Sequence, residues 1–295
     1  MIPAIPIAHR GAHGHSRPQN SLDALTHAVE LGAAFVEFDV WTAPSGQLVV
    51  SHDRPGTPRW WPWRRGRMRD DVVAPPVEPF LRVVAESKVL LNLDWKDRGH
   101  EDRVVDLLST YGLLEQTIVS STNPSALVAL RQASLRIKTG LSIPSHPESL
   151  RRLSLSIPGV GPVPAWPLRP SRIESARGWL LKHLRVLLDG THSNALMIHH
   201  PLADREVVRG LRAEGAGVFL WTARDVATFE TLDRLGADGI ATDIIARQLE
   251  SERLAAPVLG YAQMSWQCDG ATVGTRPSPY DAPMWSLTQP TPPHG

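Results

Sequence analysis

Short apolar runs alternate with longer amphipathic runs along most of the chain. The short runs are rich in β-branched residues and end at glycine or polar residues, as strands do, whereas the longer runs repeat apolar positions with helical spacing. This alternation is typical of βα units arranged around a parallel sheet. The pattern predicts strands at residues 5–10, 35–41, 89–96, 117–121, 137–142, 195–199, 218–222 and 238–241.

Amphipathic helices are predicted between these strands. Eight strands and a similar number of helices predict a (β/α)8 TIM barrel of the α/β class. We assign residues 1–254 to this barrel and the proline-rich residues 255–295 to a C-terminal extension. The helices are expected at residues 20–31, 77–87, 100–110, 172–188 and 244–254, with further helices after the strands that end at 121, 199 and 222.

One strand-like run departs from the βα alternation. Residues 47–53 follow the second strand after a short polar turn, whereas a parallel strand needs a much longer crossover. We therefore expect a β-hairpin after the second strand rather than another parallel strand. Three segments with many prolines, residues 54–79, 144–170 and 257–293, are interpreted as loops and a tail.

A pair of carboxylates lies in the second predicted strand. Glu37 and Asp39 stand two residues apart, so their side chains point to the same face of the strand. Apolar neighbours such as Phe38 and Val40 indicate that both faces are buried. Buried carboxylates this close repel each other and need a proton, an arginine or a metal ion nearby. A hard divalent cation meets this need most simply.

Polar and aromatic residues fall at the carboxyl ends of the predicted strands, where the chemistry of a (β/α)8 barrel lies. Two imidazoles, His9 at the end of the first strand and His52 after the hairpin, are placed to flank a metal ion near the carboxylates. The residues at strand ends are His9, Glu37, Asp39, Asp94, Lys96, Ser120, Ser121, His199, His200, Trp221, Thr242 and Asp243.

Composition restricts the classes of function. Apolar residues make up 42% and charged residues 21% of the chain, which is usual for a soluble globular protein. The formal net charge of +1 gives no reason to expect a nucleic-acid partner. The one cysteine, Cys268, excludes an intrachain disulfide and favours a reducing compartment, so we expect a cytoplasmic protein.

Membrane insertion is not predicted. No run approaches the roughly 18 uninterrupted apolar residues of a membrane span, and the first residues lack the pattern of a signal peptide. The segment WWPWRR at residues 60–65 combines tryptophan with arginine, which suits transient contact with a membrane surface. The alternative interpretation is an ordered surface loop.

Several segments that occur in a fixed order resemble one family. They are HRG at residues 9–11, RPQNSLDAL at 17–25, VEFDVWTAPSGQLVVSHD at 36–53, LNLDWK at 91–96, IVSS at 118–121, and FLWTARD and GADGIATD within 219–243. An HRG opening followed by E-x-D and then HD at this spacing is more specific than any single motif. The chain resembles the glycerophosphodiester phosphodiesterase family, whose TIM barrel also includes related phospholipase D type enzymes.

The resemblance implies roles for the matching residues. His9 and His52 become the catalytic acid and base, and Arg10 and Lys96 become contacts to the substrate phosphate. Trp221, from its place at a strand end, is a candidate contact to the substrate headgroup.

The resemblance also implies one divalent metal ion. Its ligands would be Glu37, Asp39 and Asp94. Because all three supply only oxygen, they favour Mg²⁺ or Ca²⁺ over zinc.

Three positions depart from the usual family pattern. Asp94 stands where typical diesterases carry glutamate, and aspartate there is similar to the phospholipase D branch. Gln19 replaces the usual glutamate after HRG. The Trp- and Arg-rich residues 54–70 replace the segment that usually follows the hairpin. His13 and His15 match no family role and are interpreted as loop residues near the rim.

These observations predict a metal-dependent enzyme that hydrolyses glycerophosphodiesters to glycerol 3-phosphate and an alcohol. Histidines acting as acid and base are suited to that reaction near neutral pH. One alternative is a phospholipase D type activity on lysophospholipids or on a phosphodiester of specialised metabolism, with a cyclic phosphate as one route. Another, from a different class, is a non-catalytic barrel that binds phosphate. The sequence does not determine the oligomeric state.

Overall fold

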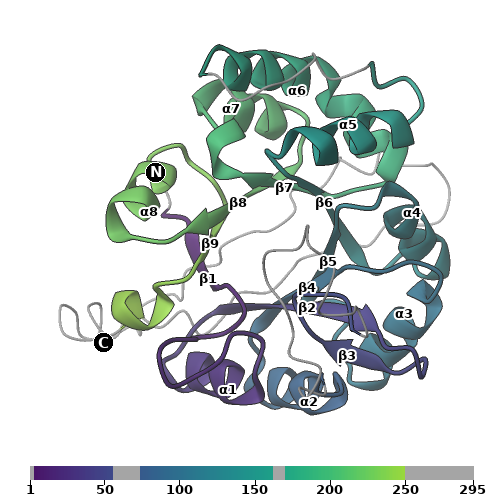
Figure 1. The fold of residues 1–295 in the computed structure, drawn as a ribbon, viewed down its shortest axis with the longest axis vertical. Helices are drawn as coiled ribbons and strands as arrows, with labels where there is room; N and C mark the ends of the chain where they lie inside the picture. Colours follow the sequence, from purple (N-terminus) through teal and green to yellow (C-terminus); the bar gives the residue numbers. More distant parts are fainter. Residues whose placement is uncertain (1–2, 56–73, 162–169, 250–295) are drawn as a thin grey trace, which may run out of the picture.

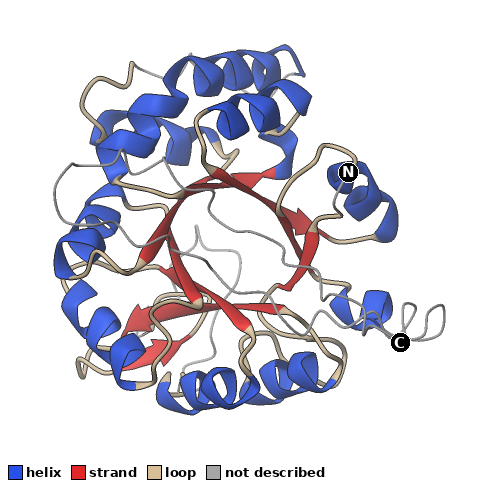
Figure 2. Cartoon of the chain, turned by 180° about the vertical axis from the view of Figure 1, so that it is seen from behind, coloured by secondary structure: helices blue, strands red, loops and turns tan. Residues whose placement is uncertain are grey.

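The computed structural model describes residues 3–55, 74–161 and 170–249. Within these ranges the strands form the wall of a barrel, and the helices surround it (Figure 1, Figure 2). None of the described helices is long and apolar enough to cross a membrane.

Two predicted features lie outside the described residues. They are the WWPWRR segment at residues 60–65, with most of the loop around it, and the proline-rich extension at 255–295, which contains Cys268. The membrane contact and the extension therefore stay predictions.

Eight parallel strands close the barrel, as predicted. Each pairs with its neighbours in chain order, and β1 pairs with both β2 and β9, which completes the circle. At the closure, Ile7 lies opposite Phe35 on one side and opposite Ala241 on the other. The strands are β1 (Ile5–Ala8), β2 (Phe35–Thr42), β4 (Leu90–Trp95), β5 (Thr117–Ser121), β6 (Lys138–Ile143), β7 (Ala195–His199), β8 (Gly217–Ala223) and β9 (Gly239–Thr242).

The remaining strand, β3 (Leu48–Val50), lies outside the circle. It pairs antiparallel with β2, with Val50 opposite Val40, so the predicted hairpin is confirmed. The backbone N–H of Ser51 then donates to the carbonyl oxygen of Asp39 at 3.0 Å. The hairpin therefore brings the segment that contains His52 beside one of the two predicted carboxylates.

Helices follow most of the strands and end close to the predicted positions. Ser21 caps the first helix, since its side chain accepts from the backbone of Ala24. After β9, residues 245–249 are helical within the described part. The helices are α1 (Leu22–Glu30), α2 (Glu78–Ser87), α3 (Glu101–Thr110), α4 (Pro124–Ala133), α5 (Pro147–Ser156), α6 (Pro170–Thr191), the 3₁₀ helix η1 (His200–Leu202), α7 (Arg205–Ala213) and α8 (Val226–Asp233).

Helix α5 corrects the prediction for residues 144–170, which was a loop throughout. Pro147 occupies the first turn of α5, where its missing N–H is not needed. Leu150 and Leu153, three residues apart, are buried on one face of the helix. Pro147 therefore starts a helix rather than preventing one.

The core has two parts. The larger part fills the layer between the strands and the helices. The smaller part plugs the inside of the barrel, where the rings of Phe35 and Phe219 meet edge to face with centroids 6.0 Å apart. Its buried members are Ile7, Phe35, Leu90, Ile118, Ala195, Met197, Phe219 and Ala241.

Polar residues follow this inner plug two positions later along several strands. Glu37 follows Phe35, Ser120 follows Ile118, and His9 follows Ile7. Because side chains alternate along a strand, each polar residue points to the same side as its apolar predecessor, one layer nearer the carboxyl end. The apolar plug thus forms the floor under a polar rim.

Gly11 fixes the turn that follows β1. Its backbone lies in the left-handed region at φ +80°, directly after Arg10 at φ +57°. A Cβ atom at Gly11 would lie 2.6 Å from the carbonyl carbon of Ala24 in α1. The glycine of the HRG motif therefore allows the turn to pack against the helix.

Replacing Gly11 by alanine is expected to lower the free energy of unfolding by at least about 1 kcal/mol, because the new methyl group meets backbone atoms that cannot move independently. Urea denaturation measures this change. Gly14→Ala is the matched control, since a Cβ at Gly14 meets nothing within 4 Å. Equal stability of the two variants would contradict the expectation.

Candidate active site

Three carboxylates converge at the carboxyl ends of β2 and β4. Asp39 lies directly opposite Asp94 in the strand pairing, and Glu37 precedes Asp39 by two residues. Glu37 is 3% exposed and Asp39 1% exposed, which confirms the expected burial. One oxygen from each of the three carboxylates lies within 4.8 Å of the others. The structure thus brings together the three residues predicted as metal ligands.

Two cations pair with these carboxylates. The Nζ of Lys96 lies 2.8 Å from Oδ1 of Asp39 and also pairs with Asp94. The Nε of Arg10 lies 3.1 Å from Oδ2 of Asp39. Burial by itself raises the pKa of Asp39, but Lys96 and Arg10 outweigh burial and hold that pKa well below its usual range.

Glu37 stands in a different electrostatic environment. Its Oε2 accepts a hydrogen bond from the backbone N–H of Arg10 at 2.8 Å. Burial, followed by repulsion from Asp39 and Asp94, raises the pKa of Glu37 well above its usual value. The ionised form of Glu37 is therefore unfavourable, because Arg10 and Lys96 do not offset its burial and the repulsion from the other two carboxylates.

The charges of this cluster fit a divalent cation. In the described part of the chain, Arg10 and Lys96 supply two positive charges against three carboxylates that carry one negative charge each when ionised. The donor set consists only of carboxylate oxygens, which hard cations prefer. These residues could therefore hold such an ion.

Asn20 holds Asp39 in place, a role that the sequence pattern did not predict. The side-chain amide of Asn20 donates to Oδ2 of Asp39 at 2.7 Å, and its carbonyl accepts from the backbone N–H of Asp39 at 3.1 Å. Nearby, Gln19 accepts from the guanidinium of Arg10 at 2.8 Å. The segment after HRG therefore supports both Asp39 and Arg10.

Asp94 has a second partner on the neighbouring strand. The hydroxyl of Ser120 in β5 donates to Oδ1 of Asp94 at 3.1 Å, while Oδ2 pairs with Lys96. Asp94 is thus oriented by both groups and points to the same rim as Asp39. The shorter arm of aspartate still reaches the other two carboxylates.

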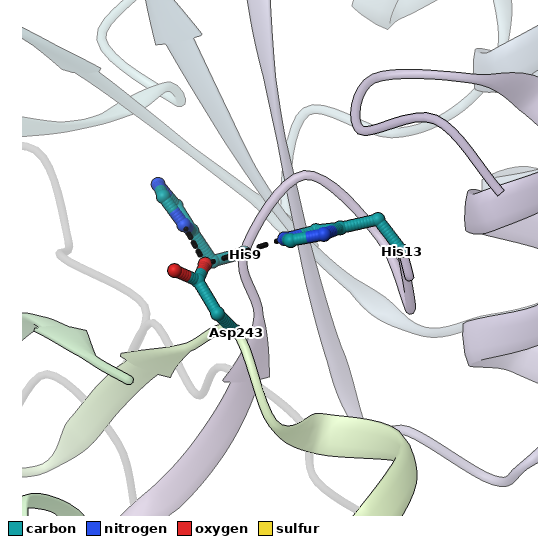
Figure 3. Close-up of side chains that lie close together, drawn as sticks. All are labelled: His9, His13 and Asp243. Atoms are coloured by element: carbon teal, nitrogen blue, oxygen red, sulfur yellow. Dashed lines mark hydrogen bonds and ion pairs between the residues drawn. The ribbon is translucent and has the colours of Figure 1, made fainter. Parts of the chain in front are cut away.

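His9 lies directly after β1, and its side chain contacts the carboxylate of Asp243, which follows the last strand, β9. Its Nδ1 lies 2.6 Å from Oδ1 of Asp243, as Figure 3 shows. A carboxylate only accepts, so Nδ1 carries the proton of the neutral ring and Nε2 keeps a lone pair. That Nε2 lies 4.0 Å from Oε2 of Glu37 and thus faces the carboxylate cluster.

The pKa values of this pair shift because of burial and the hydrogen bond. Burial lowers the pKa of His9, and the hydrogen bond to Asp243 partly opposes this shift. Burial raises the pKa of Asp243, but hydrogen bonds from His13 and His9 outweigh it and leave that pKa below its usual range. Near neutral pH the pair therefore consists of a neutral imidazole and a carboxylate.

His52 lies at the edge of the site. Its side chain is 44% exposed, and its Nδ1 lies 3.0 Å from Oδ1 of Asp53. The backbone N–H of the preceding residue, Ser51, donates to the carbonyl of Asp39, so His52 follows directly after a contact with the carboxylate strand. His52 therefore combines proximity to the cluster with access to solvent.

Trp221 and His199 form an aromatic wall on β7 and β8. Their rings lie 4.7 Å apart at 35°, and the Nε1 of Trp221 donates to the carbonyl of Met197 at 2.9 Å. The Nδ1 of His199 is hydrogen-bonded to the hydroxyl of Ser145. Burial, followed by the charges of His200 and Arg224, lowers the pKa of His199 to about 4. This wall is therefore uncharged at neutral pH.

Two residues of the site were missed as partners by sequence reasoning. Asp243 was placed at a strand end without a role, although its position after the last strand is next to the first strand in any closed barrel. Asn20 directly precedes the helix cap Ser21, and no pattern in the sequence predicts its contact with Asp39. Its left-handed backbone at φ +58° turns the side chain toward β2.

A closed (β/α)8 barrel with buried carboxylates, two cations and a histidine at the carboxyl rim defines an enzyme of the TIM-barrel class. The sequence model of the glycerophosphoryl diester phosphodiesterase family matches residues 9–62 and 84–247. The chain belongs to this family, and the predicted class of enzyme, a phosphoric diester hydrolase, is confirmed.

Known proteins of this class are similar over most of the chain. A probable glycerophosphodiester phosphodiesterase 2 of Mycobacterium tuberculosis is 25% identical over 250 residues, which cover 81% of this chain and 87% of that protein. A glycerophosphodiester phosphodiesterase of Parabacteroides distasonis superposes with a TM-score of 0.59 at 20% identity, covering 84% of this chain and 98% of that chain.

A further solved structure has a ligand. A phosphodiesterase of Oleispira antarctica, in complex with the product sn-glycerol-3-phosphate, superposes with a TM-score of 0.60 at 20% identity. It covers 85% of this chain and 98% of that chain. At this identity, the likeness to both solved structures establishes the fold alone.

Replacing Asn20 by alanine is expected to lower the free energy of unfolding by about 2 kcal/mol or more, because two hydrogen bonds to a buried aspartate are lost and alanine disfavours the left-handed backbone. Urea denaturation measures this loss. The exposed neighbour Gln19 is the control, since Gln19→Ala should cost less than about 1 kcal/mol. Similar losses in the two variants would show that Asn20 does not hold Asp39.

Proposed function

We propose that this protein hydrolyses glycerophosphodiesters to glycerol 3-phosphate and an alcohol in a metal-dependent reaction. The observation that carries the proposal is the cluster of Glu37, Asp39 and Asp94 at the barrel rim, with Lys96 paired to it and the Nε2 of His9 directed toward it. Membership of the family and the glycerol 3-phosphate bound to the Oleispira enzyme support this substrate class.

Phosphate binding is assigned to the positive side of the cluster. A Mg²⁺ or Ca²⁺ ion held by Glu37, Asp39 and Asp94 would neutralise charge on the non-bridging oxygens of the phosphate. Arg10 and Lys96 add fixed positive charge beside the same position, since both pair with Asp39. Their placement orients the diester before any bond is broken.

Proton transfer is assigned to the two histidines. With Nδ1–H held by Asp243, His9 offers the lone pair of Nε2 as a general base toward the nucleophile, which is water or a neighbouring hydroxyl of the substrate. His52 then donates a proton to the departing alkoxide, a role that suits its exposed position. Asp243 does not touch the substrate and acts as a positioning residue for His9.

The headgroup is assigned to the aromatic wall of His199 and Trp221. The N–H of Trp221 already donates to the carbonyl of Met197, so a headgroup would contact the indole ring rather than this N–H. We propose a small diester or lysolipid as substrate rather than nucleic acid, in keeping with the net charge of +1. A cytoplasmic location remains part of the proposal.

Loss of activity in two variants tests the reaction. Purified protein with Mg²⁺ or Ca²⁺ is expected to release glycerol 3-phosphate from glycerophosphodiesters. Phosphorus NMR measures this release, which should stop when a chelator removes the metal. His9→Ala should lower kcat by about 10²–10⁴-fold, as expected for a lost general base. Glu37→Gln should lose activity yet fold, because an uncharged side chain relieves the repulsion at that position.

Glu86→Gln on the exposed side of α2 is the matched control and should retain full activity. The substrate panel includes lysophospholipids, so faster turnover of these would replace the first proposal by a phospholipase D type activity. Phosphorus NMR also reports a cyclic phosphate if a substrate hydroxyl is the nucleophile. Unchanged rates in both His9→Ala and Glu37→Gln would exclude the proposed mechanism.

Asp243→Asn tests how His9 is positioned. The variant should lower kcat by roughly 10²–10⁴-fold, because the amide no longer enforces the tautomer with a free Nε2. The carboxylate also raises the pKa of His9, so its loss lowers that pKa further and moves the acid limb of the pH–rate profile to lower pH. Asp225→Asn, which keeps the cap of α8, should change neither quantity.

A further inference from the structure

A second group of potential metal ligands lies beside the carboxylate cluster. His9 follows β1, His13 lies in the loop after it, and Asp243 follows β9. One ligand atom from each lies within 4.8 Å of the others. In Figure 3 both imidazoles point toward the same carboxylate, and dashed lines join each of them to it.

The separations in this group suit a small metal ion. Oδ1 of Asp243 lies 2.6 Å from Nδ1 of His9 and 3.3 Å from Nε2 of His13. Ligands of a tetrahedral ion at zinc bond lengths lie roughly 3.3 Å apart, so the pair of His13 and Asp243 already fits, and the pair of His9 and Asp243 must open by about 0.7 Å. The side chains are 14%, 21% and 24% exposed for His9, His13 and Asp243, so an ion can reach them.

The chemistry of the ligands distinguishes this group from the first. Two imidazole nitrogens and one carboxylate oxygen suit borderline transition metals such as Zn²⁺ and Co²⁺, whereas the first group supplies only oxygen. The nearby cation Arg10 is already paired with Asp39, and Arg224 lies 3.6 Å from the other oxygen of Asp243 on an exposed side chain. Neither therefore fills the position between the imidazoles.

We propose that His9, His13 and Asp243 form a second metal site, selective for Zn²⁺ over Mg²⁺ and Ca²⁺, and that its occupation inhibits the enzyme. Inhibition follows from the two nitrogens of His9. A metal bound to Nδ1 uses the lone pair of that nitrogen, so the ring proton moves through solvent to Nε2. Nε2 then has no lone pair with which to accept a proton. This second part rests on the proposed function, whereas the binding itself does not.

His13→Gln is the decisive variant. Glutamine can still donate an amide N–H to Asp243, so the hydrogen bond and the pairing of His9 with Asp243 are retained, but the imidazole ligand is lost. His15→Gln is the matched control, because His15 is an exposed histidine of the same loop. Neither His13 nor His15 belongs to the proposed catalytic machinery.

Binding is measured on the full chain with saturating Mg²⁺, by calorimetry with Zn²⁺ and by visible absorption with Co²⁺. Wild type and His15→Gln should each bind one Zn²⁺ ion at this site. His13→Gln should bind it at least about 10–100-fold more weakly, because losing a metal ligand should cost no less affinity than losing a group that hydrogen-bonds to a ligand. The Co²⁺ spectrum of that site should disappear only in His13→Gln. Equal binding by all three proteins would overturn the site.

Inhibition is measured separately, as release of glycerol 3-phosphate at saturating Mg²⁺ with increasing Zn²⁺. Wild type and His15→Gln should lose activity at Zn²⁺ concentrations that leave His13→Gln active. Equal inhibition of all three would overturn the inhibitory role. If the chain binds Zn²⁺ through His13 yet hydrolyses no glycerophosphodiester, the metal site is supported and the proposed function is not.

Discussion

The buried carboxylate of Asp39 holds the candidate site together. It pairs with Lys96 from the end of β4 and Arg10 from the turn after β1, and it accepts a hydrogen bond from Asn20 ahead of α1. The carbonyl of the same residue accepts from Ser51 after the hairpin. A buried charge that loses its partner costs about 3–5 kcal/mol. Three of these contacts involve the carboxylate and one the backbone, and together they fix four separate segments relative to Asp39.

The same concentration of charge makes the rim less stable than an apolar core would be. Glu37 lies beside two other carboxylates with too little positive charge, and burial makes its ionised form still less favourable. Such an arrangement persists only because the inner plug around Phe35 and Phe219 and the closed strand circle hold the backbone in place. The packing of the barrel floor thus offsets the destabilising repulsion between carboxylates at the rim.

Features that depend on local periodicity could be predicted from the sequence. The two-residue spacing of Glu37 and Asp39 placed them on one buried face, and the short turn before β3 required an antiparallel return. The closed barrel predicts that the ends of the first and last strands are neighbours, but no local pattern predicts that the side chains of Asp243 and His9 are hydrogen-bonded. Helix α5 was missed because proline stops a helix in its interior but begins one at its first turn.

Closure of the barrel by β1 and β9 has a consequence for synthesis of the protein. His9 and Asp243 are separated by 234 positions in the chain. His9 is therefore among the first residues of the site to leave the ribosome, and its partner Asp243 is among the last. The strand pairs from β2 to β8 can form in order as the chain grows, but β1 gains its second neighbour only when β9 has emerged. A ribosome-bound chain that ends before residue 243 therefore carries the three carboxylates but lacks the side chain that orients His9.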